Sequence, residues 1–175
     1  MPFTTASSPA RRPFRESLLL KAFLTIFLIC WTVTFINTTD RANWITENVL
    51  TVIFVGGLAI SHRRFKFSDL SYTLIFIYIL LHIYGAEYTY AENPFGYWLQ
   101  ELTGGARNHY DRIVHCSFGL LLAYPMRDWF MNHFQWPTWV CWVLPVEITL
   151  SFSGAYELIE WLVAQVFFPA QGVAY

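Results

Sequence analysis

Long apolar stretches, separated from one another by a few polar residues, dominate the hydrophobic pattern of this chain. A helix needs about 20 residues of this kind to cross the hydrocarbon core of a membrane. Five stretches reach or approach this length, and they cover Ser17–Ile36, Ala42–Ser61, Asp69–Tyr84, Tyr110–Phe130 and Pro137–Phe168. The pattern therefore predicts an all-α polytopic membrane protein with about five transmembrane helices, in a single domain that covers residues 17–175.

The two ends of this pattern each carry a further expectation. The first apolar stretch is too long for a signal peptide and no small-residue cleavage site follows it, so we expect it to stay as a span. Residues 1–16, with Ser, Pro and Arg in place of apolar residues, predict a disordered cytoplasmic tail. The last stretch contains Pro145, which indicates one tilted or kinked helix. Two shorter helices that meet near Ser151–Gly154 are the alternative.

The connection between the third and fourth stretches, about residues 85–109, is the longest one and predicts a short helix of its own. Asn93 and Pro94 are typical of a helix N-cap and first position, and Gly104 is typical of a helix end. Apolar side chains follow at helical spacing, namely Phe95, Trp98, Leu99 and Leu102. An amphipathic helix on the outer leaflet fits this pattern. A loop helix packed on protein fits it equally.

Composition and charge support the membrane assignment and indicate an orientation. Hydrophobic residues make up 55% of the chain and charged residues 13%, about half of the charged share of a soluble domain. The net charge of −1 leaves no basic face for nucleic acid, and the three cysteines show no metal-binding or disulfide spacing. Eight of the 11 Lys and Arg residues fall on one side if the N-terminus is cytoplasmic. We therefore expect a multi-pass protein of the bacterial inner (plasma) membrane.

Ionisable side chains in spanning segments are costly, so each of them is a candidate for function. The rise of about 1.5 Å per residue gives the depth of each side chain along its span. With the N-terminus inside, the ionisable residues of three spans and one loop then lie at the outer side of the membrane. We predict a polar pocket that opens toward the outer leaflet. Its candidate residues are His82, Glu87, Arg107, Asp111, Arg112, His115, Glu157 and Glu160.

The chemistry of these residue types allows several roles. Asp111 and His115 stand four positions apart, so the carboxylate could orient the imidazole or share a proton with it. Arg107 and Arg112 could hold an anionic group. A divalent metal is a further hypothesis, with His82, Asp111, His115 and Glu157 as its ligands, although no HExxH motif is present. Other ionisable residues are interpreted as structural or interfacial: Glu47, His62, His109 and His133, with Glu147 also left outside the site.

Three functions remain open at this point, and no catalytic residue is assigned. The first is binding, with or without modification, of a lipid-linked or cell-envelope ligand alongside membrane lipids. The second is a small proton-coupled transporter, which predicts an acidic path across the membrane through Glu147. The third is a structural subunit whose charges only pair helices. The sequence indicates neither the ligand nor the oligomeric state.

Three segments carry a family resemblance. His82–Tyr88, Asn108–His115 with its DRxxH pattern, and Tyr156–Trp161 with YExxEW resemble the YjdF-like inner-membrane proteins, a family without an assigned activity. The DRxxH pattern is also similar, over little more than one span, to the DKxxH pattern of VanZ-like proteins. The resemblance implies a sixth span after a Gly-Asp-x-Trp-Asp-like stretch. This sequence stops at Tyr175 before such a stretch, so we expect a truncated or unusual member.

Overall fold

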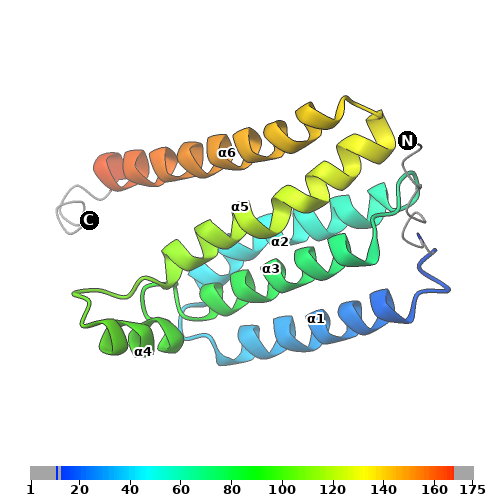
Figure 1. Ribbon diagram of the computed structural model, residues 1–175. Helices are drawn as coiled ribbons and strands as arrows, with labels where there is room; N and C mark the ends of the chain where they lie inside the picture. The colour runs from blue at the N-terminus through cyan, green and yellow to red at the C-terminus, as the bar shows by residue number, and fades with distance from the viewer. Residues whose placement is uncertain (1–10, 12, 168–175) are drawn as a thin grey trace.

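The computed structural model describes residue 11 and residues 13–167, and in this part of the chain every regular element is a helix. The helices are α1 (Leu18–Asn37), α2 (Arg41–Ser61), α3 (Asp69–Glu87), α4 (Pro94–Thr103), α5 (Tyr110–Trp129) and α6 (Thr138–Phe167), with a π-helical turn, η1 (Phe130–Phe134), between α5 and α6. The five long helices run along one common direction, and the short α4 lies at one end of them (Figure 1). The all-α fold class is confirmed.

Local sequence explains where most of these helices begin. The side chains of Ser17, Asp40, Ser68 and Asn93 each accept a hydrogen bond from a first-turn backbone N–H of α1, α2, α3 and α4. Such caps satisfy donors that have no partner within the helix. The α6 helix continues through Pro145, so the single-helix interpretation of the last apolar stretch is confirmed.

The α3 helix is the centre of the bundle. It packs against α1, α2 and α5, while α6 packs on α5. The core is formed by Ile75, Ile79 and Ile83 of α3 with Leu122 of α5. Among the described helices, α1, α2 and α3 are long and apolar enough to cross a membrane by length and composition. The α5 and α6 helices lie beside them in the same direction (Figure 1), and their spanning character stays a prediction.

The bundle has two chemically different ends. The N-terminal end is formed by residue 11, residues 13–17, the α2–α3 connection and η1. The α4 end is formed by α4, the α1–α2 connection and the loops on either side of α4. Basic residues gather at the N-terminal end, which holds Arg11, Arg15, Lys21, Arg63, Arg64, Lys66 and Arg127. Their separation from Arg41, Arg107 and Arg112 at the α4 end follows the pattern from which we predicted a cytoplasmic N-terminus.

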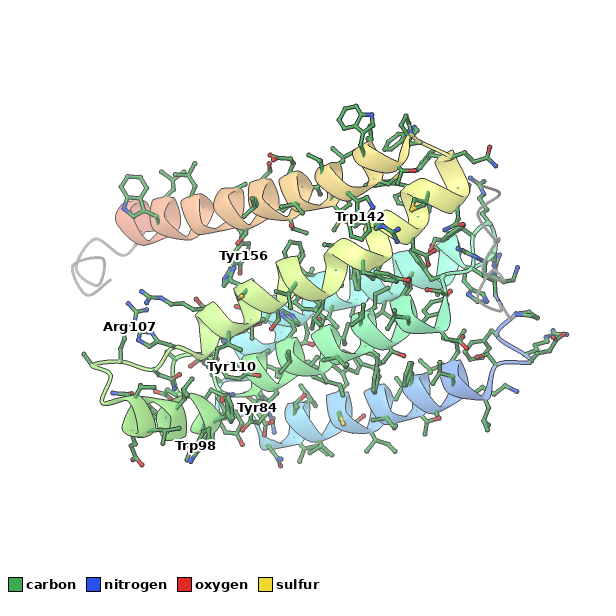
Figure 2. All side chains as sticks on the ribbon, viewed as in Figure 1. Tyr84, Trp98, Arg107, Tyr110, Trp142 and Tyr156 are labelled. Atoms are coloured by element: carbon green, nitrogen blue, oxygen red, sulfur yellow. The ribbon has the colours of Figure 1, made fainter. Side chains whose placement is uncertain are left out.

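An arginine connects α5 to α6 near the N-terminal end. The guanidinium of Arg127 lies 4.1 Å from the centre of the Trp142 ring, and Trp142 lies between the two helices (Figure 2). This cation–π contact lets a charged side chain sit against apolar helices.

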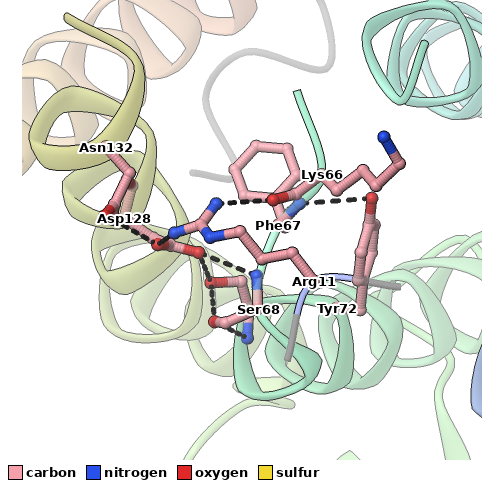
Figure 3. Close-up of polar contacts among 8 residues, drawn as sticks. Arg11, Lys66, Phe67, Ser68, Tyr72, Asp128 and Asn132 are labelled. Carbon is pink, nitrogen blue, oxygen red and sulfur yellow. Dashed lines mark hydrogen bonds and ion pairs between the residues drawn. The ribbon is translucent and has the colours of Figure 1, made fainter. Parts of the chain in front are cut away.

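The residues just before α1 are attached to the bundle by one polar cluster, which we call the Arg11–Asp128 clasp (Figure 3). Nη2 of Arg11 lies 2.6 Å from Oδ1 of Asp128. Oδ2 of Asp128 accepts hydrogen bonds from the Ser68 backbone N–H (2.9 Å) and the Ser71 hydroxyl (2.7 Å). We expected a disordered tail through residue 16, but Arg11 is packed on α5 through this contact. Arg11 also donates to the Lys66 carbonyl at 2.5 Å and lies 4.7 Å from the centre of the Phe65 ring. The disorder of the N-terminal tail stays a prediction.

Candidate functional site

A cavity of about 240 Å³ lies between α2, α3, α5 and α6, near the α4 end of the bundle. We call it the α2–α6 cavity. Its polar lining is Glu47, Tyr78, His82, Tyr90, Asp111, His115, Ser153 and Tyr156, and its apolar lining is Leu50, Val114, Phe118 and Phe152. Side chains from four helices and one loop therefore meet around a single space, within about the half of the bundle that is nearer the α4 end.

The α3 side of the cavity is built by a sharp reversal of the chain. After α3, Thr89 and Tyr90 adopt positive φ angles of 52° and 56°, and the Tyr90 N–H donates to the Gly85 carbonyl at 2.9 Å. The Tyr90 ring then lies directly on Gly85, whose missing Cβ leaves room for it. As a result the Tyr90 hydroxyl reaches Nδ1 of His82 at 2.7 Å.

The other nitrogen of His82 is the least satisfied atom of the cavity wall. Nε2 is buried and makes no well-formed hydrogen bond with any described residue. The nearby backbone of Glu47 interacts with the ring but does not meet hydrogen-bond geometry. Since a buried polar atom without a partner costs about 1–3 kcal/mol, Nε2 is a position where a ligand or water would be stabilised.

The α5 and α6 sides bring a carboxylate, an imidazole and two hydroxyl groups together. Oδ1 of Asp111 lies 3.3 Å from Nε2 of His115, as their spacing of four predicts. The Ser153 hydroxyl lies 3.4 Å from Nδ1 of the same imidazole. Tyr156 reaches from α6 toward α5 (Figure 2), and its ring centre is 5.7 Å from that of His115. His115 is thus held from both helices.

Glu47 is a cavity residue that we had interpreted as interfacial. It stands about two turns into α2 and contributes a second carboxylate to the lining. A signal was present, because an acidic residue inside an otherwise apolar helix is itself a candidate for function. The facing direction of α2, however, could not be deduced from the sequence.

The structure places three of the eight predicted residues at the cavity: His82, Asp111 and His115. Arg107 and Arg112 are exposed and do not line it, and Figure 2 shows Arg107 on the loop between α4 and α5. Glu87 is buried on another side of α3, where its carbonyl accepts from the Thr38 hydroxyl at 3.0 Å. The side chains of Glu157 and Glu160 lie outside the described residues. The two arginines do not line this cavity, and their role in holding an anionic group stays a prediction.

The hypotheses of a metal site and of a transport path can each be compared with the described residues. Among them, no three His, Cys, Asp or Glu side chains come close enough to hold a metal ion. The proposed ligand Glu157 is outside that set, so the metal site stays a prediction. Glu147, which the transport hypothesis requires, is exposed on α6 and does not line the cavity.

Long apolar helices, three of them long and apolar enough to cross a membrane, define this chain as a helical integral membrane protein. A family model described as "Predicted membrane protein (DUF2238)" matches residues 19–175, and the chain belongs to this family. It is 34% identical over 143 residues to the inner membrane protein YjdF of Escherichia coli (strain K12). The alignment covers 81% of this chain and 66% of that relative, so the chain spans less than two thirds of the relative's length.

These comparisons confirm the resemblance to YjdF-like proteins and the location in the inner membrane. No solved structure matches the chain significantly.

Proposed function

We propose that this protein binds a lipid-linked or cell-envelope molecule by inserting a small polar group into the α2–α6 cavity from the outer leaflet. The observation that carries the proposal is Nε2 of His82 in the cavity wall, which is buried and makes no well-formed hydrogen bond with a described residue. Burying a polar atom without a hydrogen-bond partner destabilises a protein, so we expect a bound partner at this position.

The lining indicates which kind of group fits. Glu47 and Asp111 contribute carboxylates, whereas the described Arg and Lys side chains do not line the cavity. A phosphate or carboxylate would therefore meet repulsion without a cation to balance it. Hydroxyl and amino groups are favoured instead, because tyrosine, serine and histidine side chains can both donate to them and accept from them.

The size of the cavity limits what can enter. A space of about 240 Å³ is below the usual range of about 300–1,000 Å³ for complete small-molecule sites. The proposal is therefore that one headgroup or one sugar-sized part enters, while the rest of the ligand stays among the lipids. Binding does not require the path across the membrane that a transporter needs, and Glu147 lies away from the lining.

The test is to identify what copurifies with the protein. Wild-type protein and the variant Ser153→Phe, whose ring would fill the cavity, are purified from membranes under mild conditions, and the bound molecules are compared by mass spectrometry. Leu120→Phe is the matched control, because Leu120 lies on α5 but is 76% exposed. We expect one hydroxylated or amine-bearing class of molecule with wild type and the control, reduced at least ten-fold with Ser153→Phe.

Thermal unfolding of all three proteins establishes that Ser153→Phe is folded. Identical bound molecules in a folded Ser153→Phe variant and in wild type would overturn the proposal.

A further inference from the structure

A second cavity, independent of the proposed function, lies at the opposite end of the bundle. The α1 and α2 helices both pack on α3 but have few contacts with each other. The result is a groove of about 170 Å³ with α3 as its floor. We call it the α1–α2 groove. It is lined by side chains of α1, α2 and α3 and of the segment before α1, among them Phe14, Leu20, Phe27, Ala59, His62 and Tyr72.

The lining is almost entirely apolar, and its polar atoms are already engaged. Nδ1 of His62 lies 2.6 Å from the Tyr72 hydroxyl, and Nε2 of His62 accepts from the Phe14 N–H at 3.1 Å. The lining residues on α1 extend from Leu20 to Phe27, which corresponds to roughly 10 Å along the helix. A narrow apolar groove of this kind, on a surface that faces lipid, suits a hydrocarbon chain.

Basic residues adjoin the lining residues at the N-terminal end of this groove in the sequence. Arg63 and Arg64 follow the groove residue His62, Arg15 follows Phe14, and Lys21 follows Leu20. All four are exposed, and none forms a salt bridge with a described carboxylate. Arg11, by contrast, is used by the clasp with Asp128. Positive charge is therefore available where the apolar groove reaches the membrane surface.

We infer that the α1–α2 groove binds one acyl chain of an anionic phospholipid, with its phosphate held by Arg63 and Arg64. Charge complementarity selects this occupant, because unpaired arginines at a membrane surface attract anionic lipid headgroups. The acyl chain of a zwitterionic lipid fills the groove equally well. Its headgroup, however, has no net negative charge and is attracted less strongly by the two arginines. The site is separate from the α2–α6 cavity, and its ligand enters from the N-terminal end.

The experiment is native mass spectrometry of the purified full chain, titrated with phosphatidylglycerol or phosphatidylcholine of identical acyl chains. We expect wild type to bind the first phosphatidylglycerol molecule at least about 25-fold more tightly than phosphatidylcholine. Arg63→Gln with Arg64→Gln reduces that preference by about five-fold for each arginine removed. Ala59→Trp, which fills the groove, weakens the binding of both lipids.

Matched control variants distinguish binding at this groove from a non-specific attraction of anionic lipid to any positive charge on the protein. Arg41→Gln with Arg107→Gln removes two positive charges at the α4 end, and Val52→Trp adds an indole to α2 outside the groove. Neither is expected to change the binding of either lipid by more than about two-fold. Equal binding of both lipids to wild type, or an equal effect of the control charges, would overturn the inference. Binding of glycerol phosphate as tightly as phosphatidylglycerol would also overturn it, because the groove would then be unnecessary.

Discussion

The hydroxyl of Tyr90 lies 2.7 Å from Nδ1 of His82 and 3.4 Å from the His82 carbonyl oxygen. A hydroxyl has one hydrogen to donate, and the shorter contact is the stronger one. The hydroxyl satisfies both contacts when it donates to the carbonyl oxygen and accepts from Nδ1–H, and Nε2 of the neutral imidazole is then an acceptor. With the proton on Nε2 instead, the hydroxyl donates to Nδ1 and His82 is a donor toward the α2–α6 cavity. The tautomer of His82 therefore decides whether the group that binds at Nε2 must donate or accept a hydrogen bond.

Replacing Gly85 by alanine should disturb this arrangement. A Cβ at position 85 would lie 2.6 Å from Cδ1 of Tyr90, so the ring and the turn that carries it must move. We expect Gly85→Ala to lower the free energy of unfolding by about 2 kcal/mol, a typical cost of overpacking. Chemical unfolding in detergent measures this change.

Gly57→Ala is the matched control for that prediction. Nothing lies within 4 Å of a Cβ at position 57, which is also inside a membrane helix, in the C-terminal part of α2. Alanine there should be neutral or stabilise by about 0.5–1 kcal/mol, because glycine is a poorer helix former. Equal effects of the two substitutions would contradict the contact between Gly85 and Tyr90.

Removing the carboxylate of the Arg11–Asp128 clasp should destabilise the protein strongly. Asp128→Ala leaves Arg11 without its ion pair and leaves the Ser68 N–H and the Ser71 hydroxyl without their acceptor. Breaking a buried pair of this kind costs about 3 kcal/mol or more. The exposed Asp69→Ala, at the same end of the bundle, should cost less than about 1 kcal/mol. Unfolding curves that rank the two variants in the reverse order would show that the clasp is not structural.

The charge of the α2–α6 cavity can be measured with a thiol at Ser153. In a variant whose Cys30, Cys116 and Cys141 are replaced by alanine, Ser153→Cys should react on the order of ten-fold faster with a trimethylammonium methanethiosulfonate than with the sulfonate reagent. The carboxylates of Glu47 and Asp111 attract the cationic reagent. Leu120→Cys should show no such preference. Labelling of intact cells also tests the predicted orientation, since these reagents do not cross the membrane.

Protonation of His62 at acidic pH should weaken the attachment of the segment before α1 to the bundle. Burial, together with the positive charge of Lys66, lowers the pKa of His62 below its usual 6.5. Protonation also removes the acceptor that Nε2 offers to the Phe14 N–H. The stability that His62 contributes is therefore present above about pH 6.5 and is lost as the pH falls below it.

Hydrogen exchange at the Phe14 amide between pH 5 and 8 tests this prediction. The exchange rate, corrected for its intrinsic pH dependence, should rise on acidification in wild type. It should be insensitive to pH in His62→Gln, whereas the exposed His133→Gln should behave as wild type does. A flat profile in wild type would contradict the role of His62.

The sequence by itself determined the length, number and direction of the helices and the level of each charged residue along them. A long run of apolar residues favours a membrane-spanning helix whichever helices become its neighbours. Caps such as Ser17 and Asn93 fix the start of a helix through contacts within its first turn. For this reason His82, Asp111 and His115 could be assigned to one end of the bundle before their contacts were known. The position of a residue along its helix axis follows from its residue number and the rise per residue, and it does not depend on how the helices pack.

Tertiary structure alone decided which way each helix faces and which helices are neighbours. The α3 helix is apolar on all sides, so no periodicity showed that His82 lines the cavity while Glu87 is buried away from it. In the same way, packing turned Glu47 inward, left Arg107 and Arg112 exposed, and brought Arg11 to Asp128 across 117 positions of the chain. Rotation about a helix axis depends on contacts between distant side chains, and these exist only once the bundle has assembled.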